Sequence, residues 1–148
     1  MAEDEAAPAR TAGPRQAVEL TAAESWRLLA SVSLGRIVFT RHAMPAIRPV
    51  NHLVDHEAII IRSHLGASIV SRAAGDGTVV CYEADDIDPV RHTGWSVIIT
   101  GLARLVSDPA AISGYQQVLQ PWADTQMDYV IAIEPKVITG LRLVGWCR

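Results

Sequence analysis

The chain has little of what marks a secreted, membrane-bound or nucleic-acid-binding protein. It contains only two cysteines in 148 residues, which excludes a disulfide framework. It has no apolar run long enough to span a membrane, and its N-terminus lacks the apolar core of a signal peptide. The formal net charge is −3 and the basic residues are scattered, which argues against a nucleic-acid partner. We therefore expect a cytoplasmic protein that binds neither nucleic acid nor membrane.

The sequence also lacks the residue clusters that bind metals or form a catalytic triad. His52 and His56 are four residues apart, but they flank a predicted turn and no carboxylate or cysteine completes a tetrahedral zinc set. The acidic residues of segment 83–88 lack the glycine and the terminal glutamate of a calcium loop. We interpret this segment as a solvated loop that pairs with Arg91. No metal site is predicted.

What is present fits one globular domain. Apolar residues make up 49% of the chain and charged residues 20%, and the length is sufficient to bury a core. Residues 1–18 are rich in alanine, proline and charge and have almost nothing to bury, so we expect a disordered N-terminal leader there. A single domain is expected over residues 19–148.

Most of this domain reads as strand. Thr21 and Glu24 form a capping box that starts a short helix ending near Ser33, and Asp108 and Pro109 start a later one. Segments of alternating or continuous apolar residues lie between turn signals, with Gly101 as a bulge, and the last two are expected to form a hairpin around residues 134–136. Seven antiparallel strands with short connections favour a closed or half-closed β-barrel. The expected strands are 35–41, 46–54, 58–63, 78–85, 94–106, 127–133 and 137–144, and the other helices are 67–72 and 110–119.

One segment has the composition of a phosphate cradle. Three isoleucines at 59–61 indicate a buried strand that ends in Arg62 and Ser63. A glycine-containing turn follows and opens the expected helix 67–72. A guanidinium, a hydroxyl and the free N–H groups of a helix N-terminus are suitable donors to a phosphate.

The order of the motifs resembles that of the pyridoxamine 5′-phosphate oxidase-like superfamily, which has the FMN-binding split-barrel fold. The similarity covers residues 20–143, and within the superfamily the small single-domain, nitroimidazole-reductase-like branch is the nearest. The motifs are GRIVFT (35–40), MPAIRPVNH (44–52), IIIRSHLGAS (59–68), VVCYEAD (79–85), GWSVIITGLARLV (94–106) and IEPKVITGLRL (133–143).

The resemblance implies a mainly β fold, an antiparallel split β-barrel with short peripheral helices. It also implies a homodimer with FMN in clefts at the subunit interface, acting as an oxidoreductase that transfers hydride to an unidentified small molecule. The reaction takes place on the flavin, so no catalytic side chain is identified. The cofactor-binding residues implied are Pro49, Val50, Asn51, Ile61, Arg62, Ser63, Ser68, Trp95 and Ser96.

The chain departs from the family at one position. Relatives commonly carry a lysine one turn into the helix after Ser63, where this sequence has Ala67 and Ser68. The missing ammonium removes a charge-assisted contact worth about 1.5–3 kcal/mol. Two alternatives therefore stay open beside FMN catalysis. One is a reductase that uses an 8-hydroxy-5-deazaflavin, and the other is a non-catalytic dimer that binds a flavin or another small ligand.

Individual residues also have simpler interpretations. Arg62 at a strand end is often a surface ion-pair partner, and Asn51 could pair across a hairpin. Trp95 alternates with Val97 in a strand and suits a core or a dimer interface, which leaves Ser96 on the opposite face as a solvent-side hydroxyl.

Overall fold

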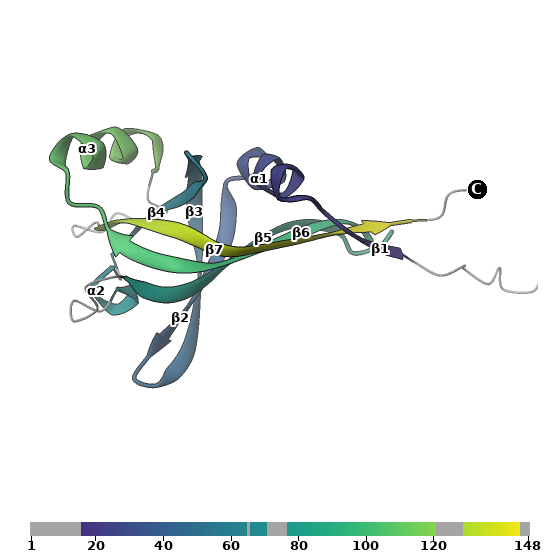
Figure 1. The fold of residues 1–148 in the computed structure, drawn as a ribbon, viewed down its shortest axis with the longest axis horizontal. Coiled ribbons are helices and arrows are strands. Elements are labelled where there is room, and N and C mark those ends of the chain that lie inside the picture. Colours follow the sequence, from purple (N-terminus) through teal and green to yellow (C-terminus); the bar gives the residue numbers. More distant parts are fainter. Residues whose placement is uncertain (1–15, 65, 71–76, 121–128, 146–148) are drawn as a thin grey trace, which may run out of the picture.

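The computed structural model describes residues 16–64, 66–70, 77–120 and 129–145. Within them, strands dominate and three short helices lie at the periphery (Figure 1). The strands are β1 (Gln16–Glu19), β2 (Leu34–Arg41), β3 (Met44–Asp55), β4 (Ala58–Ser63), β5 (Thr78–Asp88), β6 (Thr93–Leu105) and β7 (Tyr129–Val144). The helices are α1 (Ala22–Ser31), α2 (Gly66–Ile69) and α3 (Pro109–Val118).

All strand pairs are antiparallel, and they close on themselves. The order along the sheet is β1-β7-β4-β3-β2-β5-β6, and β6 pairs again with β7. Six strands therefore form a ring, with β1 added outside it on β7. This arrangement confirms the predicted antiparallel split barrel with short peripheral helices.

Capping residues fix where the two longer helices begin. The Thr21 side-chain oxygen accepts from the Glu24 backbone N–H at 3.1 Å, and Asp108 accepts from the Ala111 N–H at 3.2 Å with Pro109 as the first helical residue. Both starts agree with the sequence prediction. Helix α1 ends at Ser31, two residues earlier than expected.

The C-terminal hairpin predicted around residues 134–136 is wrong. Strand β7 runs without a turn through Pro135 and pairs with β6 along almost its whole length. The proline is accommodated at a bulge, where Thr100 faces Val137 and Gly101 faces Pro135, so Lys136 is the extra residue. A side chain at Gly101 would overlap the Glu134 carbonyl oxygen, which explains why glycine stands at the predicted bulge.

Other boundaries differ less. Residues 16–18, expected to belong to the leader, form most of β1, and β5 continues three residues beyond its expected end. The described part of the helix expected at 67–72 is the four-residue α2, and residues 71–76 and 127–128 lie outside the described part. The turns at 42–43 and 56–57 are tight, with positive φ at all four residues.

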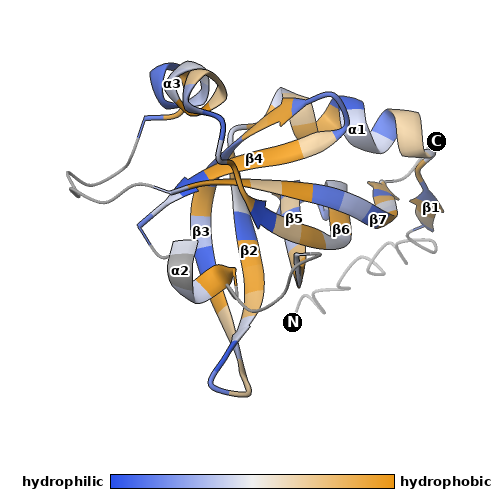
Figure 2. Cartoon of the chain, turned by 60° about the vertical axis from the view of Figure 1, so that its left-hand side comes forward, coloured by the Kyte–Doolittle hydropathy of each residue, from blue (hydrophilic) through white to orange (hydrophobic). Residues whose placement is uncertain are grey.

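The barrel interior is the main core. The six strands of the ring all contribute inward-facing side chains to it, and β4 is largely hydrophobic in Figure 2. A smaller cluster lies outside the barrel wall, where Ile60 and Val130 pack beneath the C-terminal end of α3 at Leu119. Helix α3 therefore covers the outer face of β3, β4 and β7 and defines the wall of the site described next.

Candidate functional site

The end of β4 meets the C-terminal end of α3 through Arg62. Its Nη1 donates to the Leu119 carbonyl at 2.8 Å and to the Gln116 carbonyl at 3.3 Å. The last carbonyls of a helix have no partner within the helix, so a guanidinium placed there satisfies them. Arg62 therefore holds α3 against the barrel, which is a structural role that the sequence motif does not reveal.

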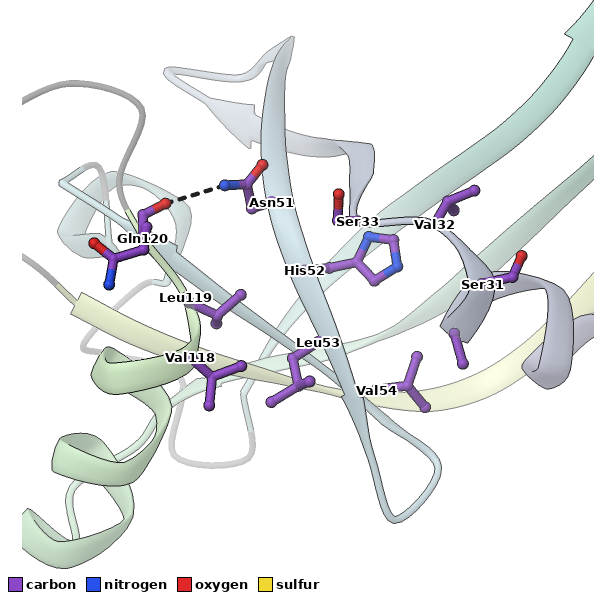
Figure 3. Close-up of a pocket in the computed structure, with 11 residues that line it drawn as sticks. Ser31, Val32, Ser33, Asn51, His52, Leu53, Val54, Val118, Leu119 and Gln120 are labelled. Atoms are coloured by element: carbon purple, nitrogen blue, oxygen red, sulfur yellow. Dashed lines mark hydrogen bonds between the residues drawn. The ribbon is translucent and has the colours of Figure 1, made fainter.

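Asn51 lies beside Arg62 on the neighbouring strand. The register pairs His52 with Ile61, which puts Asn51 and Arg62 on the same outer face of β3 and β4. The Asn51 amide nitrogen donates to the Gln120 carbonyl at 3.0 Å (Figure 3). Two of the predicted site residues thus converge on the chain that leaves α3.

A cavity of about 470 Å³ opens next to Asn51 (Figure 3). It lies between the C-terminal end of α1, the C-terminal part of β3 and the C-terminal end of α3. A second cavity of about 510 Å³ shares Leu53, Val54 and Val118 with it and extends along α3. Apolar walls with a few polar groups at the rim are typical of small-molecule sites. The first cavity is lined by Ala30, Ser31, Val32, Ser33, Asn51, His52, Leu53, Val54, Val118, Leu119 and Gln120.

Helix α3 is also anchored near its middle. The Tyr115 hydroxyl donates to Asp55 Oδ2 at 2.6 Å, and Asp55 Oδ1 lies 2.6 Å from His56 Nδ1. The Tyr115 hydroxyl lowers the pKa of Asp55, with a smaller contribution from His56, and the same contact raises the pKa of Tyr115. The wall of the cavity is thus tied to the β3–β4 hairpin as well as to Arg62.

A buried chain of hydrogen bonds supports the floor of the cavity. His52 Nε2 lies 2.7 Å from the Leu29 carbonyl, and His52 Nδ1 lies 2.5 Å from the Tyr82 hydroxyl. A carbonyl only accepts, so Nε2 carries the proton and the Tyr82 hydroxyl donates to Nδ1. Burial lowers the pKa of His52, partly offset by the Leu29 contact, and burial raises the pKa of Tyr82. Both groups are therefore neutral at physiological pH.

Tyr82→Phe tests this chain. The variant leaves the buried Nδ1 of His52 without its donor, so we expect the free energy of unfolding to fall by about 1–3 kcal/mol. Urea denaturation at pH 7.5 measures the difference. Tyr115→Phe, which removes a hydroxyl from a part-buried contact, is the matched control and should cost less than the loss of the buried Tyr82 hydroxyl. Equal losses for the two variants would contradict the assignment.

A second polar cluster lies on the outer face of β2 and β5. Arg36 Nη1 is 3.0 Å from Glu83 Oε2 and 3.5 Å from Asp85 Oδ2. Burial raises the pKa of Glu83 to about 7, helped by the hydrogen bond and repulsion from Asp85 and opposed by Arg36. This corrects the interpretation of segment 83–88 as a solvated loop, because Glu83 and Asp85 lie within a strand. Arg91 was expected to pair with an acidic residue of this segment, and its partner is Asp88, at 4.0 Å.

The described residues contain no group of three or more side chains suited to a metal ion. None of the helices in these ranges is long and apolar enough to cross a membrane.

The sequence model of the pyridoxamine 5′-phosphate oxidase family matches residues 21–142, most of the chain. The chain belongs to this family. An uncharacterised protein of Mycobacterium tuberculosis is 56% identical over 137 residues, which cover 90% of each chain. A solved structure of a candidate pyridoxamine 5′-phosphate oxidase of Corynebacterium glutamicum is 32% identical, with a TM-score of 0.73 over 88% of this chain and 100% of that one. An FAD-binding protein of Mycobacterium smegmatis is 36% identical, with a TM-score of 0.67 over 84% of this chain and 98% of that one.

The residues that the family resemblance implies for cofactor binding lie on both faces of the barrel wall. Those with side chains on the outer face are Pro49, Asn51, Arg62 and Ser96. The first three are close together on β3 and β4. Ser96 is on β6, separated from β3 by β2 and β5, so one copy of the chain does not bring it to Asn51.

The remaining implied residues have little exposed side chain. Val50, Ile61 and Trp95 belong to the interior core, and Ser63 is 9% exposed. Trp95 thus agrees with the simpler interpretation as a core residue. Ser68 lies half-buried on α2. Because α2 has only four residues, its backbone would contribute little to a phosphate cradle of the kind that the sequence suggests.

Sequence reasoning missed two features of the site. The His52–Tyr82 hydrogen bond and the Arg36–Glu83 ion pair both join residues far apart in the chain. The alternation of each strand gives the face on which a side chain lies, but pairing across strands requires the register.

Proposed function

We propose that this protein is an FMN-dependent oxidoreductase in which FMN lies at the interface of a homodimer and hydride passes through it to a small molecule. The observation that carries the proposal is the family match over residues 21–142, with Pro49, Asn51 and Arg62 gathered on one outer face beside a cavity. The FAD-binding relative at 36% identity supports a flavin as the cofactor.

The residues around the cavity suit a flavin. Leu53 and Val118 give an apolar surface for a ring, and the amides of Asn51 and Gln120 give donors and acceptors at its edge. Arg62 and Ser68 are the groups assigned to the phosphate, with no lysine beside them. When bound, the flavin supplies the hydride-transfer chemistry, and the protein binds it, orients it and limits its contact with water.

The outer sheet surface supports a dimer. Apolar side chains are well exposed there, including Val79 at 65%, Val137 at 56% and Ile98 at 43%. Exposed apolar patches of this kind usually mark an interaction site. The surface comprises the outward residues of β2, β5, β6 and β7, which also include Val38, Leu102 and Leu141.

The β2–β3 hairpin extends this surface. Strand β2 pairs with β5 only over residues 36–38, so the hairpin projects beyond the barrel as an arm (Figure 1). The arm presents Met44, 66% exposed, and Ile47, 53% exposed. A projecting arm with exposed apolar side chains has little to gain alone and fits against a second copy of the chain.

A titration of the ligand-free protein tests the cofactor. FMN, FAD and an 8-hydroxy-5-deazaflavin are added in parallel, and fluorescence of the flavin is followed. Saturation by FMN at low micromolar concentration, one per protomer, supports the proposal. Saturation only by the deazaflavin or by FAD replaces FMN with that cofactor, and no binding of any of the three overturns the flavin assignment.

Arg62→Ala should weaken FMN binding by about 10-fold to 100-fold, because a contact to a charged group is worth about 1.5–3 kcal/mol. Arg62 also holds α3, so the Tm of the variant is measured alongside and Arg62→Lys is included to keep the charge. Arg91→Ala, which removes an exposed guanidinium on another turn, is the control. Unchanged affinity in folded Arg62→Ala protein would remove Arg62 from the phosphate site.

Ser68 favours a second candidate function, a dimer that binds a flavin or another small ligand without catalysing a reaction. A half-buried hydroxyl in place of an ammonium weakens the hold on a phosphate. Reduction of bound flavin by a nicotinamide cofactor, followed at its absorption band, separates the two, because a binding protein holds the flavin without turnover.

A further inference from the structure

The Arg36–Glu83–Asp85 cluster lies among apolar side chains of the outer surface, and the ion pairs of Glu134 with Arg104 and Lys136 lie further along it on β6 and β7. The side chains of the cluster are 43%, 24% and 32% exposed, and both carboxylates lie within 3.5 Å of one guanidinium nitrogen. Ile98 on β6 is the register partner of Glu83, and Pro49 on β3 is the register partner of Arg36. The cluster therefore sits within the surface assigned above to the homodimer, and association would bury it.

The charge of the cluster depends on one proton. Arg36 balances a single carboxylate, so the cluster carries one surplus negative charge when Glu83 and Asp85 are both ionised. It is neutral when the two carboxylates hold one proton between them, which the raised pKa of Glu83 favours. The other outward neighbours include no basic side chain: they are Cys81 on β5, and Ser96, Ile98 and Thr100 on β6. No other described residue of β2 or β6 that faces Glu83 can offset the surplus charge.

Two-fold symmetry doubles the cost of burying the surplus negative charge. In a two-fold dimer the same surface meets itself, so two clusters are buried together. Burying an unbalanced charge is costly, and two of them repel. A proton on each carboxylate pair removes both penalties.

We propose that the Arg36–Glu83–Asp85 cluster makes dimerisation proton-dependent, so that two protomers associate tightly only when each Glu83–Asp85 pair holds one proton. The inference rests on the homodimer of the proposed function. Association then takes up protons from solution in the pH range where the free protomer is largely deprotonated, and dissociation releases them.

Sedimentation equilibrium of the full-length chain at pH 6.0, 7.0 and 8.5, at constant ionic strength, tests this. If association raises the pKa of each pair by one further unit above the value of about 7 at Glu83, the dimer dissociation constant rises about 50-fold from pH 6.0 to pH 8.5, about sevenfold for each protomer. A dimer whose dissociation constant is the same at all three pH values overturns the inference and leaves the homodimer standing. A monomer at every pH overturns the homodimer itself.

Two variants test whether Glu83 and Asp85 are responsible for the pH dependence of dimerisation. Glu83→Gln and Asp85→Asn each leave one carboxylate for Arg36, so both should associate at pH 8.5 as the wild type does at pH 6.0. Asp86→Asn removes an exposed carboxylate on the same strand but on its other face, and should keep the pH dependence of the wild type. The reverse pattern, with pH dependence lost only in Asp86→Asn, would assign the effect elsewhere.

Discussion

Replacing Gly35 with alanine is expected to lower the free energy of unfolding by about 3 kcal/mol, the upper end of the usual cost of overpacking a core. The Tyr82 ring packs directly on the Gly35 backbone, and a Cβ atom there would overlap the ring and its hydroxyl. It would also come within 2.7 Å of the Glu83 carbonyl oxygen. The two strands cannot easily move apart to make room, because β2 and β5 are paired from Arg36 to Val38. One of the obstructing atoms, the Glu83 carbonyl oxygen, is itself backbone.

Gly114→Ala is the matched control for this experiment. Gly114 lies inside α3, and an added Cβ there meets nothing within 4 Å. Alanine is the better helix former, so this variant should gain about 0.5–1 kcal/mol. Urea unfolding of both variants gives the two differences under one set of conditions. Similar effects of the two substitutions would show that the Tyr82 packing does not determine the cost at Gly35.

The strands that lie between clear turn signals were predictable from the sequence. The β4 prediction has both boundaries right, because three isoleucines lie between a polar turn and a glycine. The helix starts at Thr21 and Asp108 were predictable for the same reason, because each capping side chain accepts from a backbone N–H only three residues further along the chain. Local signals of this kind need no knowledge of the rest of the fold.

The error at the C-terminus has a physical cause. Glu134, Pro135 and Lys136 have the composition of a turn, and proline lacks the N–H that a central strand requires. The deciding partner is Gly101, more than thirty residues away in the sequence, whose missing side chain lets β7 bulge past the proline. A sequence reading assigns each segment separately, whereas a bulge belongs to a pair of strands.

The candidate site likewise has features that the local sequence indicates and features that depend on distant partners. The family resemblance implied Asn51 and Arg62 as cofactor-binding residues, and the register puts both on one outer face. Sequence reasoning did not find that both bind the end of α3, because those contacts span 69 and 54–57 residues. The function of a residue in a barrel wall depends on its face, and a strand presents opposite faces at successive residues.

Ser68→Lys should tighten FMN binding by about 10-fold to 100-fold, since the restored ammonium adds a charge-assisted contact of about 1.5–3 kcal/mol. Ser68 is half-buried on α2, just beyond the end of β4. Ser68 is one of the two positions, with Ala67, at which the family resemblance implies a lysine in relatives. Fluorescence titration of the variant and the wild type measures the ratio of the two dissociation constants.

Two comparisons make the Ser68 result specific. Riboflavin has the same ring as FMN but no phosphate, so Ser68→Lys should leave riboflavin affinity unchanged. Ser68→Met has a side chain of similar length without charge and should leave FMN affinity unchanged. Equal tightening of riboflavin and FMN would mean that the new ammonium acts on the ring or on the fold, and no tightening of either would place the phosphate away from α2. Tighter binding of FMN alone would show that the wild-type serine weakens the hold on the phosphate. The ring contacts proposed for Pro49 and Asn51 would then be unaffected by the substitution.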